Sequence, residues 1–163
     1  MRVISVVKRV ILGAFLISLS VFVSLYLKEY MDRKNPDYAI PQLTVTADGQ
    51  VLDLYLSNYY WRLNFGKEVE KLEPEIDGGA VRILDEGIVQ KNTLHGGEEL
   101  KYEFSQQESI RYIDRSEAYS TVSFLLADNE RYAPSEPGVY YYRVSAEFER
   151  GRVEYYFRVD VVP

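Results

Sequence analysis

His95 is the only histidine of this 163-residue chain, and the chain contains no cysteine. A Ser-His-Asp triad needs a histidine held between a nucleophile and an acid. Thiolate metal sites, disulfides and cysteine nucleophiles all need cysteine. A lone histidine before the Gly96–Gly97 pair is typical of a solvent-facing turn residue, so we assign it no catalytic function.

Acidic side chains gather in three stretches, which are Glu68, Glu70, Glu73, Glu75 and Asp77; Asp85 and Glu86; and Glu98 and Glu99. Their spacing differs from the Asp-x-Asp-x-Asp-Gly ladder of a calcium loop. Glycoside hydrolysis needs two facing carboxylates, but a chain this acidic brings some pair to that distance by chance. We therefore interpret the three stretches as solvated charge and expect no catalytic, metal or cofactor site.

The 15 tyrosines are the unusual feature of the composition. Most suit half-buried positions on strands, because an aromatic ring with a polar tip fits a pleated surface. Tyr141 and Tyr156 instead alternate with Arg143 and Arg158, and tyrosine with arginine is typical of binding surfaces. Two interpretations stay open for these four residues: a cross-strand tyrosine pair that stabilises a sheet, or a surface that contacts a partner.

These residues lie in a predicted β-hairpin over Val139–Val161. Alternate residues of both arms are apolar or aromatic, which is the two-residue period of a half-buried strand. The predicted inward set is Tyr140, Tyr142, Val144, Ala146 and Phe148, with Val153, Tyr155, Phe157, Val159 and Val161. The opposite faces, which carry Tyr141 and Tyr156, are expected to meet water.

The rest of residues 42–163 is predicted to form further short strands. Asp48–Gly49 favours a tight type I′ turn between Leu43–Ala47 and Val51–Leu56. The next candidate strand, Ser57–Leu63, contains the single tryptophan. We predict that Trp61 is an inter-sheet core residue rather than a ligand platform. Gly66–Gly79 is predicted to be a long loop that has room for one short element. The remaining candidate strands are Ala80–Leu84, Gly87–Gln90, Leu100–Phe104, Ile110–Ile113 and Thr121–Ala127. Short strands separated by turns indicate an all-β antiparallel sandwich.

Val10–Leu27 is an uncharged apolar run, and a helix of that length spans about 27 Å. We expect a transmembrane helix over residues 10–27, a short cytoplasmic tail over 1–9 and a juxtamembrane linker over 28–41. A cleaved signal peptide and a buried helix of a soluble domain are the weaker alternatives. Basic residues before the run favour a cytoplasmic N-terminus, so the β domain is expected outside the plasma membrane.

Charge divides unevenly along the chain. Residues 1–35 carry six Lys or Arg and two Asp or Glu, whereas residues 36–163 carry 13 and 23. A domain this acidic is repelled by phosphate backbones, so we exclude a nucleic-acid partner.

Several stretches together resemble a group of small, uncharacterised proteins of Gram-positive bacteria that are secreted or anchored in the membrane. These stretches are Pro41–Gly49, Leu56–Trp61, Gly96–Phe104, Pro137–Ala146 and Gly151–Val159. The resemblance implies an immunoglobulin-like sandwich and no assigned activity. Members often carry a cysteine before the tryptophan, where this chain has Tyr60, so no disulfide is implied here.

The leading hypothesis is a single-pass membrane protein whose extracytoplasmic domain is a non-catalytic binding or accessory module. Its expected partners are the lipid bilayer and another membrane or envelope protein. An envelope hydrolase that uses paired carboxylates and a small structural subunit of a membrane complex are the alternatives.

Overall fold

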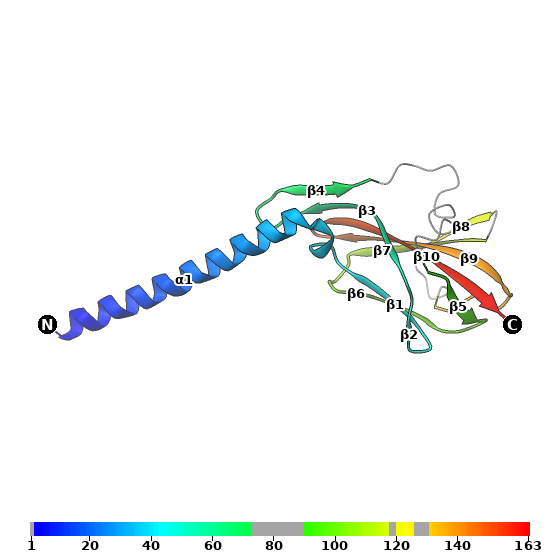
Figure 1. The fold of residues 1–163 in the computed structure, drawn as a ribbon, viewed down its shortest axis with the longest axis horizontal. Helices are drawn as coiled ribbons and strands as arrows, with labels where there is room; N and C mark the ends of the chain where they lie inside the picture. Colours follow the sequence, from blue (N-terminus) through cyan, green and yellow to red (C-terminus); the bar gives the residue numbers. More distant parts are fainter. Residues whose placement is uncertain (1, 73–89, 118–119, 126–130) are drawn as a thin grey trace. The chain divides into compact units, whose positions relative to one another are not determined.

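A computed structural model describes residues 2–72, 90–117, 120–125 and 131–163. One long helix is followed by a short 3₁₀ helix and ten strands (Figure 1). The elements are α1 Arg2–Lys34, η1 Pro36–Tyr38, β1 Leu43–Ala47, β2 Gln50–Val51, β3 Tyr55–Arg62, β4 Glu68–Lys71, β5 Asn92–His95, β6 Leu100–Phe104, β7 Ile110–Glu117, β8 Ser120–Leu125, β9 Gly138–Phe148 and β10 Gly151–Val162.

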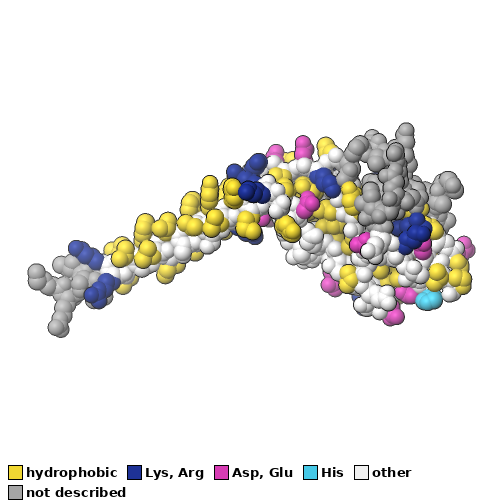
Figure 2. All heavy atoms as spheres, in the orientation of Figure 1, with side chains coloured by type: hydrophobic (Ala, Val, Ile, Leu, Met, Phe, Trp, Pro, Cys, Tyr) yellow, Lys and Arg dark blue, Asp and Glu magenta, His cyan; other side chains and the backbone are white. Residues whose placement is uncertain are grey.

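The helix is long and apolar enough to cross a membrane. Figure 2 shows hydrophobic side chains along it, with Lys and Arg at both ends. It extends beyond the apolar run to Lys34, so the first half of the expected linker is helical. Nothing between Leu27 and Lys34 breaks a helix, and Arg33 pairs with Glu29 one turn earlier. The helix ends before Pro36, as expected from the conformational restriction that a proline places on its predecessor.

The chain forms two compact units. The first contains Met1–Ala39 together with Leu63–Lys67, the turn that joins β3 to β4. The second contains Ile40–Arg62 and Glu68–Pro163, which include every strand.

The strands form two sheets. One has the order β2-β1-β6, and the other has the order β4-β3-β10-β9-β7-β8 with β5 beside β10. Aromatic rings join the sheets: Phe104 of β6 lies 5.3 Å from the ring of Phe148 in β9 and 6.2 Å from that of Tyr155 in β10. The prediction of an N-terminal apolar helix followed by antiparallel sheets is confirmed, although neither sheet closes on itself within the described residues.

The terminal hairpin is the centre of the core. All ten residues predicted to face inward on β9 and β10 are buried. The rings of Tyr142 and Phe157 stack 4.6 Å apart at an interplanar angle of 5°. Trp61 is also buried and meets Phe148 of the same sheet edge to face at 5.7 Å, so the prediction of a core tryptophan is confirmed, whereas its contact with the other sheet stays a prediction.

The predicted turn at Asp48–Gly49 is confirmed. Both residues have positive φ, 45° and 79°, and Ala47 pairs with Gln50 across a two-residue loop. The expected second arm, Val51–Leu56, is wrong in its extent, because β2 ends at Val51 and the chain crosses to the other sheet before β3 begins at Tyr55.

One strand pair departs from the antiparallel prediction. β10 pairs with β3 through Tyr156 and then with β5, in parallel, from Val159 to Val162. β10 is longer than its contact with β3, so its last residues have an edge that β5 occupies. Within the predicted loop Gly66–Gly79, residues 68–71 form β4; the candidate strand 80–84 and nearly all of 87–90 lie outside the described residues.

Candidate functional site

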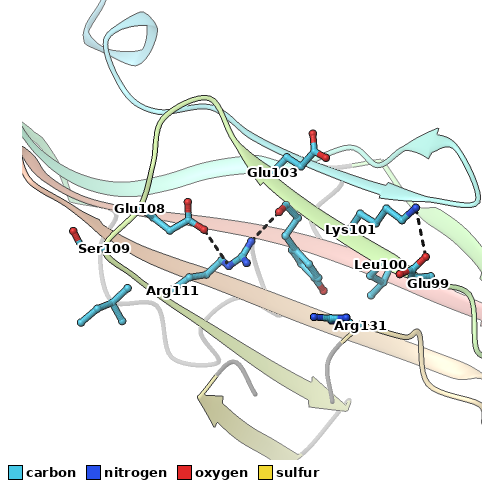
Figure 3. Close-up of a pocket in the computed structure, with 10 residues that line it drawn as sticks. Glu99, Leu100, Lys101, Glu103, Glu108, Ser109, Arg111 and Arg131 are labelled. Atoms are coloured by element: carbon cyan, nitrogen blue, oxygen red, sulfur yellow. Dashed lines mark hydrogen bonds and ion pairs between the residues drawn. The ribbon is translucent and has the colours of Figure 1, made fainter. Parts of the chain in front are cut away.

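A groove of about 560 Å³ lies between β6 of one sheet and β7 of the other. Figure 3 shows its lining side chains. Three carboxylates and three cations line it: Glu99, Glu103, Glu108, Lys101, Arg111 and Arg131. It therefore combines both signs of charge in one opening.

Arg111 is the most firmly placed cation of the groove. Its Nη1 donates a hydrogen bond of 2.8 Å to the backbone oxygen of Tyr102, and its Nε lies 3.5 Å from Oε1 of Glu108. The guanidinium also lies 5.9 Å from the centre of the Tyr102 ring. Figure 3 shows the guanidinium between these two partners, so Arg111 links the start of β7 to the edge of β6.

The sequence places these side chains through strand alternation. Leu100, Tyr102 and Phe104 face inward from β6, while Lys101 and Glu103 face outward. The Tyr102 ring lies 6.4 Å from that of Phe157, so the groove rests on the hydrophobic core. Lys101 is more exposed than Arg111 and lies 3.5 Å from Glu99.

Among the described residues, the outer edge of β6 has backbone partners at the beginning of the strand. Leu100 donates its N–H to the oxygen of Arg131 at 2.6 Å, and Ala133 donates to Glu98 at 2.8 Å. Further along, the oxygen of Tyr102 accepts the Arg111 side chain instead of a strand. The groove therefore lies along the part of the β6 edge that follows these backbone hydrogen bonds.

The structure brings the four predicted partner residues together on one face of the β9–β10 hairpin. Arg158 lies opposite Tyr141 and Tyr156 lies opposite Arg143, so the direct cross-strand pairs are tyrosine with arginine. The predicted tyrosine–tyrosine pair is diagonal rather than direct. The Arg158 guanidinium lies 5.9 Å from the Tyr141 ring centre and its Nε lies 2.6 Å from Oδ1 of Asp160.

Both tyrosines are buried, which corrects the expectation that this face meets water. Tyr141 is 5% exposed and Tyr156 is 8% exposed, and they form a small cluster against which Tyr55 and Val139 pack. Aromatic rings can be excluded from water on the second face of a sheet as well as the first. This face therefore offers no free tyrosine surface, and contact of Arg143 or Arg158 with a partner stays a prediction.

Asn92 is a structurally central residue that sequence reasoning missed. Its Nδ2 donates to the backbone oxygens of Asp53, at 3.1 Å, and Arg158, at 2.9 Å, while its Oδ1 accepts the N–H of Asp53 at 2.8 Å. Asp53 in turn accepts the N–H of Gln90. The side chain of Asn92 thus supplies hydrogen bonds at the point where the partner of β10 changes from β3 to β5. No sequence motif identifies Asn92 as a residue with this role.

His95 is exposed at the end of β5, and its Nδ1 lies 3.2 Å from the oxygen of Pro163. Glu68 and Glu70 lie on β4, and Glu98 accepts the backbone N–H of His95. The other predicted acidic residues, 73, 75, 77, 85 and 86, lie outside the described part of the chain. In the residues that the structure describes, no three His, Cys, Asp or Glu side chains gather in a way that could hold a metal ion.

Tyr60 forms a hydrogen bond with Glu68 across the β3–β4 pair. This bond, followed by burial and by the negative charge of Glu68, raises the pKa of the Tyr60 hydroxyl above its usual value. The ring is 40% exposed, so the pair is a surface feature.

Comparison of the chain with protein-family models, with curated proteins and with solved structures gives no match.

Proposed function

We propose that this chain is a single-pass membrane protein that presents a non-catalytic binding or accessory module outside the plasma membrane. The observation that carries the proposal is the groove between β6 and β7, where a cation fixed by the fold faces solvent beside a partly paired strand edge. Such an arrangement suits recognition of another protein, because preorganised arginine lowers the cost of ordering on binding.

The charges of the groove favour recognition over chemistry. Glu108 pairs with Arg111 and Glu99 pairs with Lys101, so these two carboxylates already neutralise cations. A hydrolase of the two-carboxylate type would need carboxylates that act on a substrate bond rather than on neighbouring cations. A membrane tether adds to recognition, since it raises the effective concentration of the groove for partners in the same membrane.

The finer parts of the proposal are the immunoglobulin-like form of the sandwich and the cytoplasmic N-terminus. Support for the first comes from two sheets whose aromatic rings pack together and from a buried tryptophan in the larger sheet. Support for the second comes from Arg2, Lys8 and Arg9 before the apolar run.

A site-specific crosslink tests the binding proposal. Because the chain has no cysteine, Ser109→Cys provides a single thiol at the rim of the groove for a short crosslinker in native membranes. We expect a discrete adduct with a membrane or envelope protein. Arg111→Met should reduce its yield roughly ten-fold, since a hydrogen bond to a charged group is lost.

Lys101→Met is the matched control, because it removes a more exposed cation of the same groove and should change the yield much less. Fluorescence of the buried Trp61 verifies that each variant is folded. An adduct that is absent, or equally strong in Arg111→Met, would contradict the proposal. For orientation, protease added to intact cells should digest the domain, and survival of the domain would refute a cytoplasmic N-terminus.

A further inference from the structure

The turn between β3 and β4 belongs to the same compact unit as the helix. It is a defined turn: Leu63 donates its N–H to the oxygen of Lys67 at 2.7 Å, and Gly66 donates to the oxygen of Leu63 at 3.0 Å. Gly66 has a φ of +80°, which glycine adopts without strain. Leu63 is buried, whereas Phe65 is 50% exposed at the tip of the turn.

The helix of this unit continues beyond the apolar run with a polar segment. Among the described helix side chains, Glu29 and Asp32 are the buried ones, 2% and 8% exposed, and they lie three residues apart on one face. At 1.5 Å per residue they stand about 3 and 7.5 Å beyond Leu27, the end of the apolar run. The headgroup layer on each side of a bilayer is roughly 5–8 Å thick. The helix residues just beyond Leu27 are therefore at headgroup level when the apolar run spans the hydrocarbon core, and the turn belongs to the same compact unit as these residues.

The exposed groups of this unit suit that level. Lys28, Arg33, Lys34 and Lys67 are exposed. Of the three acids of this unit, Asp37 is also exposed, whereas Glu29 and Asp32 are buried. Tyr30, which lies under the Lys34 ammonium at 4.8 Å, is exposed like Phe65. Figure 2 shows the Lys and Arg side chains gathered at the end of the helix. Net positive charge beside exposed aromatic rings is typical of surfaces that meet anionic lipid.

We propose that the turn Leu63–Lys67 is a second membrane contact, in which Phe65 enters the headgroup layer and Lys67, with Lys28, Arg33 and Lys34, binds anionic lipid headgroups. The inference rests on the proposed membrane anchoring of the helix. Its consequence is that this unit meets the membrane at two places, the helix and the turn that joins β3 to β4.

The test uses the full chain in lipid vesicles and a set of single cysteines. Phe65→Cys, Leu19→Cys and Gln50→Cys each carry an environment-sensitive fluorophore, with no competing thiol. Leu19 lies in the apolar run, and Gln50 is an exposed residue at the start of β2. Nitroxide lipids labelled at the headgroup or deep in the acyl chain, and aqueous acrylamide, quench the fluorophore. Vesicles are zwitterionic, or contain anionic lipid.

With anionic lipid, the label at position 65 should be quenched by headgroup nitroxide and shielded from acrylamide, and the label at position 50 should behave oppositely. Lys67→Gln, added to Phe65→Cys, should lower the ratio of docked to undocked turn about five-fold, the effect of one basic residue at an anionic surface. The side chain of Lys67 is exposed, so this change leaves the turn folded.

Two failures are distinguishable. If position 19 reports the hydrocarbon core while position 65 resembles position 50, the turn is not a membrane contact and the anchoring proposal stands. If position 19 is also accessible to acrylamide, the anchoring proposal falls and this inference falls with it. Equal shielding of position 65 in zwitterionic and anionic vesicles, or no effect of Lys67→Gln, would overturn the anionic-lipid assignment.

Discussion

Replacement of Asn92 by alanine should strongly destabilise the β domain, although no sequence motif surrounds this residue. The side chain is 9% exposed and makes three hydrogen bonds to backbone groups of Asp53 and Arg158. Each such bond contributes about 1 kcal/mol, and buried partners left unpaired cost at least as much. We therefore expect Asn92→Ala to lower the free energy of unfolding by about 3 kcal/mol.

Asn58→Ala is the matched control. Asn58 is half-buried on β3 and donates a 2.8 Å hydrogen bond to the carboxylate of Glu154. Loss of this bond should cost about 1 kcal/mol. Both variants replace asparagine by alanine. They differ in the number of backbone groups that lose a hydrogen bond to the side-chain amide.

Asn92→Asp separates hydrogen bonding from the loss of volume. Aspartate keeps the size of the side chain and the acceptor for Asp53 N–H, but it replaces the donor with an oxygen that faces two carbonyl oxygens. We expect this variant to be at least as unstable as Asn92→Ala at neutral pH, because a buried charge lacks a partner there.

The assay is urea unfolding of the full chain in detergent micelles, followed by the fluorescence of Trp61. This residue is the only tryptophan and is fully buried, so its emission reports the packing of the core. A loss for Asn92→Ala no larger than that for Asn58→Ala, or a neutral Asn92→Asp, would refute the argument that this amide joins β3, β5 and β10.

Two further predictions concern the core and the surface. Phe157→Ala should lower the free energy of unfolding by about 3–5 kcal/mol, since the ring is fully buried and stacked; Val51→Ala, at an exposed position, should stay within about 0.5 kcal/mol, and equal effects would show that the faces of the hairpin are misassigned. The hydroxyl of Tyr60 should ionise at a higher pH than that of a free tyrosine, because its hydrogen bond to Glu68 stabilises the protonated form. The stability that the Tyr60–Glu68 hydrogen bond contributes is present below the usual tyrosine pKa and is lost as pH rises through the raised pKa. The difference in absorbance between the protein and Tyr60→Phe measures the titration of Tyr60. An unchanged titration of Tyr60 in Glu68→Gln would contradict the assignment of the raised pKa to Glu68.

Local patterns in the sequence account for the elements that depend on neighbouring residues. The uncharged run that ends at Leu27 determines an apolar helix, since 18 residues without charge are long enough to cross the hydrocarbon core. Asp48–Gly49 determines its turn, because both positions need positive φ. Strict alternation in Tyr140–Phe148 and Val153–Val161 likewise determines which residues enter the core.

Tertiary structure alone decided which strands become neighbours and what covers their second faces. Alternation places Tyr141 and Tyr156 on the outer face but cannot say that this face is also covered, because burial depends on distant segments. The groove at Arg111 and the amide bridge at Asn92 join residues that are 9 to 66 positions apart. A hydrogen bond between such residues leaves no periodic trace in the sequence, so only the packing of the two sheets reveals it.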